Sequence, residues 1–168
     1  MKNKLISSLG KTLMRLQPLK VVIVDDVKTY FNEQMLNLAM ANGNLKIERY
    51  YKCDQNLLNS FANVERDIII LDIKGTIDKN LGNDGFDIAR YLANNTNTFI
   101  VITSAHKYHL KNQNNFGDYV LEERLLTPID FVEELNHIIN LYLKNKIGFY
   151  KKGIYRVGKY VYKISTST

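Results

Sequence analysis

The sequence predicts an α/β protein with a doubly wound, five-stranded parallel sheet. Two short runs, residues 21–24 and 68–71, consist only of Val, Ile and Leu, and each is followed by aspartate. Runs that are apolar throughout are typical of strands buried on both faces, as in a parallel sheet. Between residues 21 and 145 five predicted strands alternate with five helical patterns. This alternation favours right-handed crossovers and helices on both faces of the sheet.

The first half of the chain alternates as this fold requires. After the strand at 21–24, residues 28–42 repeat apolar side chains at helical spacing, and Asn42 followed by Gly43 is expected to end that helix. Residues 45–51 alternate between polar and apolar side chains, which indicates a more exposed strand. Asp54 is the expected N-cap of the next helix. Its apolar positions are Leu57, Leu58 and Phe61.

The second half continues the alternation. The strand at 68–71 is followed by a polar, glycine-bearing stretch and then by a helix predicted at 85–93. The apolar run 99–102 predicts the fourth strand, and a weakly patterned segment leads to a short fifth strand at 119–121. The last helix is expected to begin near Pro128, because proline suits the first turn of a helix, and it continues as a strong apolar stripe.

The two ends of the chain differ from this core in charge. Residues 1–19 predict a basic amphipathic helix whose leucine stripe packs on protein, and residues 147–168 a basic β-hairpin tail. Residues 1–20 hold five basic residues and residues 144–168 hold seven, with no acid in either. The stretch between them has 11 basic and 17 acidic residues. The domain predicted at 20–146 is therefore acidic and is not a nucleic-acid surface.

Composition excludes several classes of protein. The single cysteine, Cys53, excludes a disulfide framework and a cysteine-based zinc site, and is interpreted as a small residue at a strand end. No apolar run approaches the roughly 20 residues that span a membrane. The N-terminus lacks the apolar core and cleavage site of a signal peptide. We therefore expect a cytoplasmic protein with no membrane partner.

Carboxylates follow two of the predicted buried strands. Asp25 and Asp26 come directly after residues 21–24, and Asp72 follows residues 68–71. In open α/β sheets functional groups collect at the carboxyl ends of the strands. Three carboxylates brought together there repel one another unless a cation lies among them, and oxygen ligands of this kind suit Mg²⁺. The sequence therefore predicts a magnesium site.

With these residues the stretch from about 20 to 145 resembles the receiver domains of two-component response regulators, whose fold is flavodoxin-like. The pair Asp25-Asp26 matches the family's acidic pair after the first strand, and Asp72 matches its single aspartate after the third. The other matches are Gly85 opening the third helix, Thr103 after the fourth strand and Tyr119 on the fifth.

The resemblance implies a phosphorelay chemistry. Asp72 would accept a phosphoryl group as an acyl phosphate. Mg²⁺ would be held by Asp25, Asp26, Asp72 and the main-chain carbonyl of Ile73. The implied phosphodonor is a cognate histidine kinase or phosphotransfer protein, and no enzyme activity beyond self-phosphorylation is implied.

The resemblance also implies a conformational switch. Thr103 would be the switch hydroxyl that bonds the phosphoryl oxygens, and Tyr119 the switch aromatic. The result would be a shifted protein–protein interface, with a homodimer as the expected assembly.

Two features depart from the family pattern. Receivers carry a lysine just after the fifth strand that contacts the phosphoryl group, and Glu122 stands at that position here. The stretch from Asp72 to Gly85 is several residues longer than the family's loop and carries Lys74 and Lys79, either of which could supply the positive charge. The alternative function is a degenerate pseudo-receiver, a dimerisation or docking module independent of phosphorylation.

Two further resemblances concern function. The tail looks like the opening strands of the winged-helix effector domain that follows many receivers, so DNA would be a partner only if such a domain followed. The segment around Asp72 also resembles the first motif of haloacid-dehalogenase-type phosphatases. That family needs a second acid two residues after the nucleophile, where this chain has Lys74.

Overall fold

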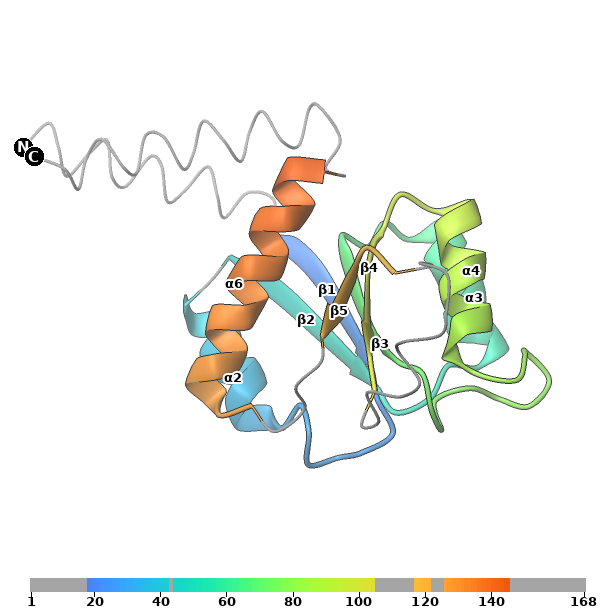
Figure 1. The fold of residues 1–168 in the computed structure, drawn as a ribbon, viewed down its shortest axis with the longest axis horizontal. Coiled ribbons are helices and arrows are strands. Elements are labelled where there is room, and N and C mark those ends of the chain that lie inside the picture. The colour runs from blue at the N-terminus through green and yellow to red at the C-terminus, as the bar shows by residue number, and fades with distance from the viewer. Residues whose placement is uncertain (1–17, 43, 105–116, 122–125, 146–168) are drawn as a thin grey trace, which may run out of the picture.

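The computed structural model describes residues 18–42, 44–104, 117–121 and 126–145. Within them, five parallel strands form one sheet in the order β2-β1-β3-β4-β5 (Figure 1). The strands are β1 (Leu19–Val24), β2 (Leu45–Tyr50), β3 (Ile68–Asp72), β4 (Phe99–Thr103) and β5 (Tyr119–Leu121). The doubly wound parallel sheet predicted from the sequence is confirmed.

The helices of the described residues lie in two layers, one on each face of the sheet (Figure 1). The helices α2 (Glu33–Asn42) and α6 (Pro128–Asn145) cover one face, and α3 (Gln55–Asn63) and α4 (Gly85–Asn95) cover the other. Residues 1–17 of the predicted N-terminal arm, the tail predicted at 147–168 and the fifth helix expected between β4 and β5 lie outside the described residues. The end of the arm predicted at 1–19 was placed wrongly, because Leu19 is the first residue of β1.

The central strands are buried on both faces, as their sequences require. Along β1, Val21 and Ile23 pack toward α2 and α6, and Val22 and Val24 toward α3 and α4. The same alternation holds in β3 and β4, where every residue is buried. Each of these strands contributes side chains to two apolar cores. A continuous apolar run fits this position because both faces of the strand are buried.

The helix predicted at 28–42 begins later than expected, at Glu33. The side chain of Asn32 accepts a hydrogen bond from the Met35 amide (3.1 Å), which is the contact of an N-cap residue. The preceding turn is held instead by Arg49 of β2, whose guanidinium donates to main-chain carbonyls of that turn. The prediction of a start at Lys28 was wrong because a side chain from another strand replaces the helical partners of these carbonyls.

Other boundaries are close to those predicted. Asp54 is the N-cap of α3 and accepts from the Leu57 amide (2.8 Å). Asp84 caps α4 in the same way through the Phe86 amide (2.9 Å). The helix α4 ends at Asn95, two residues beyond the predicted end.

The long connection from β3 to α4 is anchored to the segment after β2. Cys53 and Ile77 form an isolated parallel bridge, with hydrogen bonds from the Cys53 amide to the Thr76 carbonyl and from the Asp78 amide to the Cys53 carbonyl. Lys52 and Asp78 add an ion pair. Cys53 is fully buried, and burial together with the nearby Asp54 and Asp78 raises the pKa of its thiol to about 12.

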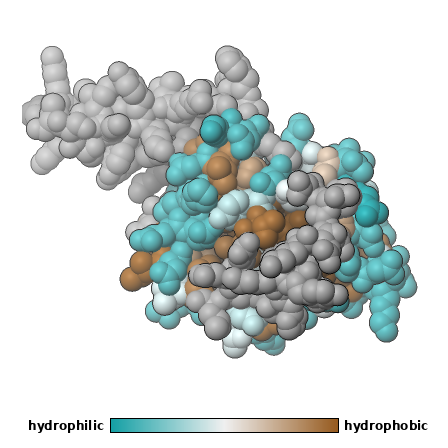
Figure 2. Space-filling model, viewed as in Figure 1, coloured by the Kyte–Doolittle hydropathy of each residue, from teal (hydrophilic) through white to brown (hydrophobic). Residues whose placement is uncertain are grey.

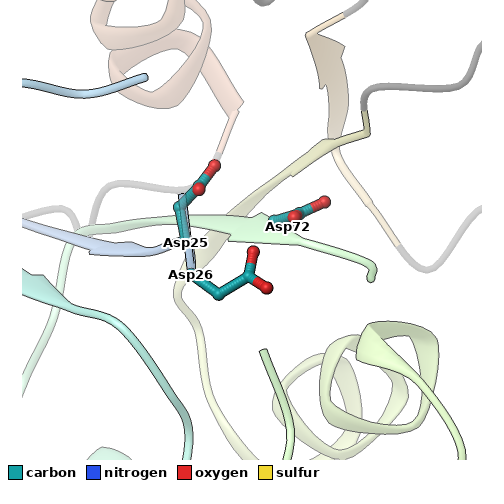
Figure 3. Close-up of side chains that lie close together, drawn as sticks. All are labelled: Asp25, Asp26 and Asp72. Atoms are coloured by element: carbon teal, nitrogen blue, oxygen red, sulfur yellow. The ribbon is translucent and has the colours of Figure 1, made fainter. Parts of the chain in front are cut away.

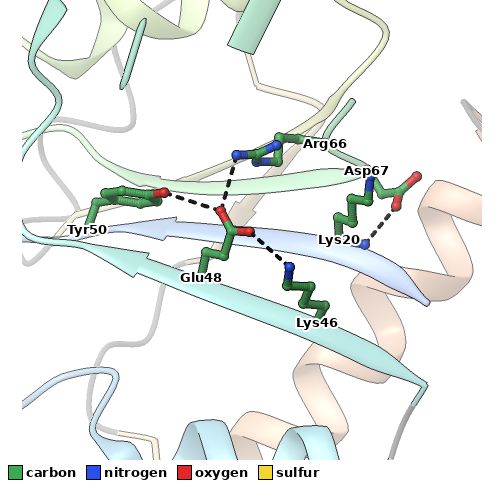
Figure 4. Close-up of polar contacts among 6 residues, drawn as sticks. All are labelled: Lys20, Lys46, Glu48, Tyr50, Arg66 and Asp67. Atoms are coloured by element: carbon green, nitrogen blue, oxygen red, sulfur yellow. Dashed lines mark hydrogen bonds and ion pairs between the residues drawn. The ribbon is translucent and has the colours of Figure 1, made fainter. Parts of the chain in front are cut away.

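A polar network links neighbouring strands at the amino end of the sheet (Figure 4). Asp67, just before β3, accepts hydrogen bonds from the Lys20 amide (2.7 Å) and the Tyr142 hydroxyl (2.5 Å). Arg66 reaches across β1 to Glu48 on β2 (3.1 Å). Burial, with Asp67 as acceptor, raises the pKa of Tyr142 well above its ordinary value. These contacts tie β1, β2, β3 and α6 together at this end of the sheet.

The described surface is mostly polar in the view of Figure 2, with apolar residues gathered near the middle of that face beside α6. Large exposed apolar side chains among the described residues include Val120 on β5 and Ile129 on α6. Among the described helices, none is both long and apolar enough to cross a membrane.

Candidate functional site

The strand ends bring the predicted site residues into one row. Asp72 and Thr103 are the last residues of β3 and β4 and pair directly with each other. The pairing of Val24 with Leu71 places Asp25 next to Asp72 in the same row. Paired residues of neighbouring parallel strands project from the same face about 4.8 Å apart. The row Asp25, Asp72, Thr103 therefore follows from the strand register alone.

Three carboxylates cluster at this row (Figure 3). One oxygen each of Asp25, Asp26 and Asp72 lie within 4.8 Å of one another. Asp25 and Asp72 are buried and Asp26 is exposed. At this separation two ionised carboxylates repel by on the order of 3 kcal/mol for an effective dielectric constant of about 20. A cation shared among the oxygens would remove that repulsion.

Main-chain amides orient two of these carboxylates. The Val27 amide donates to Oδ1 of Asp25 (2.8 Å), and the Lys74 amide donates to Oδ1 of Asp72 (3.3 Å). The hydroxyl of the buried Thr76 donates to the main-chain carbonyl of Asp72 (2.6 Å). The loop after β3 therefore fixes both the backbone and the side chain of Asp72.

Two glycines let other segments approach the cluster closely. Gly75 has a φ of +78°, and a Cβ atom there would stand 2.1 Å from a carboxylate oxygen of Asp26. A Cβ atom on Gly85 would stand 2.7 Å from the Asp72 carbonyl oxygen and from the Cα atom of Ile73. The first glycine makes room for the acidic pair, and the second lets α4 start against the end of β3.

Thr103 presents a buried hydroxyl at the end of β4. Its side chain is fully buried, and its Oγ1 atom has no hydrogen-bond partner among the described residues. An unpaired buried hydroxyl costs about 1–3 kcal/mol. Because Thr103 pairs with Asp72, this hydroxyl is placed to bond a group attached to that carboxylate.

The remaining predicted site residues have other surroundings. The Ile73 carbonyl accepts a hydrogen bond from the Gly85 amide (2.8 Å), which leaves one lone pair. Lys74 and Lys79 are exposed on the loop after β3. The Tyr119 hydroxyl donates to Glu134 on α6 (2.6 Å), and its ring lies edge-on to His137. Glu122 lies outside the described residues.

The residues at this edge suit a hard divalent cation. All three clustered side chains offer carboxylate oxygen, which is the ligand type of Mg²⁺. Burial of two of them makes an uncompensated charge cluster costly. The unpartnered hydroxyl of Thr103 stands next to them and fits an additional oxygen-bearing group.

Sequence reasoning missed three residues that shape the site: Arg49, Gly75 and Thr76. Gly75 carried a signal, because a glycine following a strand-end aspartate is compatible with a positive φ. Arg49 and Thr76 carried none, since each acts through a main-chain contact that only the folded chain creates.

Solved receiver structures resemble this fold. The response regulatory domain of protein mrkE from Klebsiella pneumoniae has a TM-score of 0.58 at 18% identity, covering 76% of this chain and 100% of that chain. The response regulator domain of Thermotoga maritima CheB has a TM-score of 0.56 at 14% identity, covering 75% and 97%. RcsB, solved as two dimers bound to two parallel DNAs, has a TM-score of 0.54 at 16% identity, covering 79% and 63%.

No protein-family model and no curated protein matches the sequence. At these identities the structural likeness concerns the fold. The order of the five strands and the helices on both faces agree with it. The described part of the chain therefore has the flavodoxin-like fold of response regulator receiver domains, with an acid cluster at the carboxyl end of its sheet.

Proposed function

We propose that this protein is a phosphorelay receiver in which Asp72 accepts a phosphoryl group. The observation that carries the proposal is the pairing of Asp72, within its cluster of carboxylates, with Thr103, whose buried hydroxyl has no hydrogen-bond partner in the part of the chain that the structure describes. A carboxylate oxygen of Asp72 attacks phosphorus, an O–P bond forms, and the bond from phosphorus to the donor breaks with its electron pair leaving on the donor.

Asp25, Asp26 and Asp72 are the residues that would hold Mg²⁺, with the free lone pair of the Ile73 carbonyl as a further ligand. When bound, the ion supplies positive charge that offsets the carboxylates and the transferred phosphoryl group. The Lys74 amide, which already bonds Asp72, holds the nucleophile in place. A donor protein with a phosphorylated histidine is the partner of this chemistry.

Thr103 links phosphorylation of Asp72 to a conformational change in this proposal. Its hydroxyl gains an acceptor when Asp72 carries a phosphoryl group, which draws Thr103 inward toward the phosphoryl oxygens. Tyr119 is the second element of the switch, because its hydroxyl bond to Glu134 links β5 to α6. A shifted protein–protein face, including a homodimer, is the proposed consequence, and the dimers described for the structurally similar RcsB support it.

Glu122 favours a second candidate, a pseudo-receiver that docks or dimerises without phosphorylation. A carboxylate at that position repels a phosphoryl group, whereas Lys74 on the neighbouring loop can offset it. Glu122→Lys should raise the yield of phosphoprotein in the first case. An unchanged yield would mean that Lys74 already fills the role, and Lys74→Gln should then lower it.

The deciding experiment is intact-mass measurement after incubation with acetyl phosphate and Mg²⁺. We expect the mass of one added phosphoryl group on the wild type, none on Asp72→Asn, and none when EDTA replaces Mg²⁺. Asp78→Asn is the matched control, because Asp78 lies on the same loop but outside the cluster. An unmodified wild type would leave the docking module as the better function.

A further inference from the structure

Arg49 contacts the loop that carries the acidic pair. It lies near the carboxyl end of β2, where it pairs with Ile23 of the neighbouring strand β1. Its guanidinium donates to the main-chain carbonyls of Val27 (2.8 Å), Lys28 (3.2 Å) and Phe31. Three bonds from one side chain therefore fix the turn between β1 and α2, which follows directly on Asp25 and Asp26.

The Val27 carbonyl also accepts from the Tyr30 amide within the turn (3.2 Å), whereas the carbonyls of Lys28 and Phe31 lie before the start of α2 at Glu33 and bond the guanidinium. The side chain of Asn32 caps the helix, so Lys28 and Phe31 precede its hydrogen-bond ladder. A planar guanidinium reaches several carbonyls from one fixed position, which a lysine ammonium on a flexible chain does not reproduce. The ring of Tyr51 lies 4.7 Å from the guanidinium carbon and limits its movement.

Val27 connects this contact to the acid cluster. Its amide donates to Oδ1 of Asp25 (2.8 Å), and its carbonyl accepts from Arg49 (2.8 Å). The orientation of the Asp25 carboxylate therefore depends on a residue whose other main-chain group is held by the guanidinium. The bonds of Arg49 described here all go to carbonyl oxygens, so its contribution is geometric rather than neutralisation of the carboxylates.

We propose that Arg49 is a positioning residue for the magnesium site, acting through Val27 on Asp25. The inference rests on the proposed function, since it concerns the cation that the acid cluster would bind. Without Arg49 the turn after β1 loses three hydrogen bonds and keeps the weaker restraint of the Tyr30 amide on the Val27 carbonyl. Asp25 then samples more orientations, and the three carboxylates are less often in place together.

The test compares two arginines of similar surroundings. Arg66 also makes a side-chain contact to β2, and its Nε atom, like that of Arg49, is buried without a hydrogen-bond partner among the described residues. It lies at the opposite end of the sheet and bonds Glu48. Arg66→Met therefore controls for the loss of a buried guanidinium. Arg49→Lys keeps the positive charge of Arg49 but removes the planar guanidinium with its several N–H donors.

The dissociation constant for Mg²⁺ is measured by calorimetric titration of the full chain. We expect it to rise at least tenfold in Arg49→Met, severalfold in Arg49→Lys, and less than twofold in Arg66→Met. Hydrogen exchange of the Val27 amide, measured without Mg²⁺, should accelerate in the two Arg49 variants alone.

Each outcome decides a different statement. A wild type that binds no Mg²⁺ overturns the metal site and the role of Arg49 with it. A wild type that binds, with unchanged affinity in Arg49→Lys and Arg49→Met, overturns the role of Arg49 alone. If Arg66→Met weakens Mg²⁺ binding as much as Arg49→Met does, the effect comes from a general loss of stability and not from the position of Arg49. If Arg49→Met does not fold, Arg49→Lys against Arg66→Lys carries the same comparison.

Discussion

The strand β3 has a buried aspartate at each end, and the two have opposite surroundings. Asp67, before the strand, accepts hydrogen bonds from the Lys20 amide and the Tyr142 hydroxyl. Asp72, the last residue of the strand, lies in a cluster with Asp25 and Asp26 and pairs with Thr103 of β4. Their exposed fractions are 1% and 2%, so burial does not distinguish them.

The difference shows how neighbours decide what a buried carboxylate does. The donors around Asp67 bond both of its carboxylate oxygens and tie β1, β3 and α6 together. Around Asp72 the neighbouring carboxylates of Asp25 and Asp26 repel its charge, and a bound cation would relieve that repulsion. Asp67 therefore joins elements of the fold, whereas Asp72 lies where like charges gather.

The largest effect that tests this comparison is expected from Asp67→Asn. An amide can accept from only one of the two donors, and its NH₂ group then faces the other. We expect the free energy of unfolding to fall by about 1.5–3 kcal/mol, the range for hydrogen bonds to a charged group. Urea unfolding followed by circular dichroism measures it. A neutral effect would mean that Asp67 is not the structural member of the pair.

Mg²⁺ should stabilise the carboxyl end of the sheet by mass action. At a concentration ten times the dissociation constant the gain is about 1.4 kcal/mol, visible as a raised melting temperature. Asp26→Ala should abolish the shift, and Asp67→Asn should retain it despite its lower starting stability. No shift in the wild type at millimolar Mg²⁺ would show that the cluster is not a magnesium site.

A smaller effect of opposite sign is expected from Asp72→Asn without Mg²⁺. Removing one of three like charges should raise the free energy of unfolding by about 1 kcal/mol, after discounting the Coulomb repulsion for partial solvation. The asparagine oxygen can still accept from the Lys74 amide, so that hydrogen bond is kept. A destabilised Asp72→Asn would contradict the contrast between the two ends of β3.

The smallest effect concerns pH. The folded-state pKa of Tyr142 is raised by burial and by its bond to Asp67, so the protonated phenol is favoured in the folded protein. Its contribution to stability is complete below the unfolded pKa of about 10 and is lost as pH rises above it. Between pH 9 and 11 the free energy of unfolding should fall less steeply with pH in Tyr142→Phe than in the wild type. Parallel curves would exclude this linkage.

The sequence by itself determined the sheet and its row of acids. Runs such as 68–71 leave no polar face, so they fit only a strand covered on both sides, and parallel strands bring their carboxyl ends to one edge. The caps Asp54 and Asp84 act within three residues of themselves, and a local rule was enough to find the first. Asp25, Asp72 and Thr103 were identified for the same reason, since each directly follows or ends an apolar run.

Only the tertiary structure decided the contacts that join distant segments. The bond between Asp67 and Tyr142 spans 75 residues, and that between Arg49 and Val27 spans 22. The late start of α2 and the anchoring of the loop after β3 at Cys53 depend on contacts of this kind. A side chain that reaches a main-chain carbonyl of another element leaves no periodicity in its own neighbourhood, because its partner is fixed by the packing of the sheet.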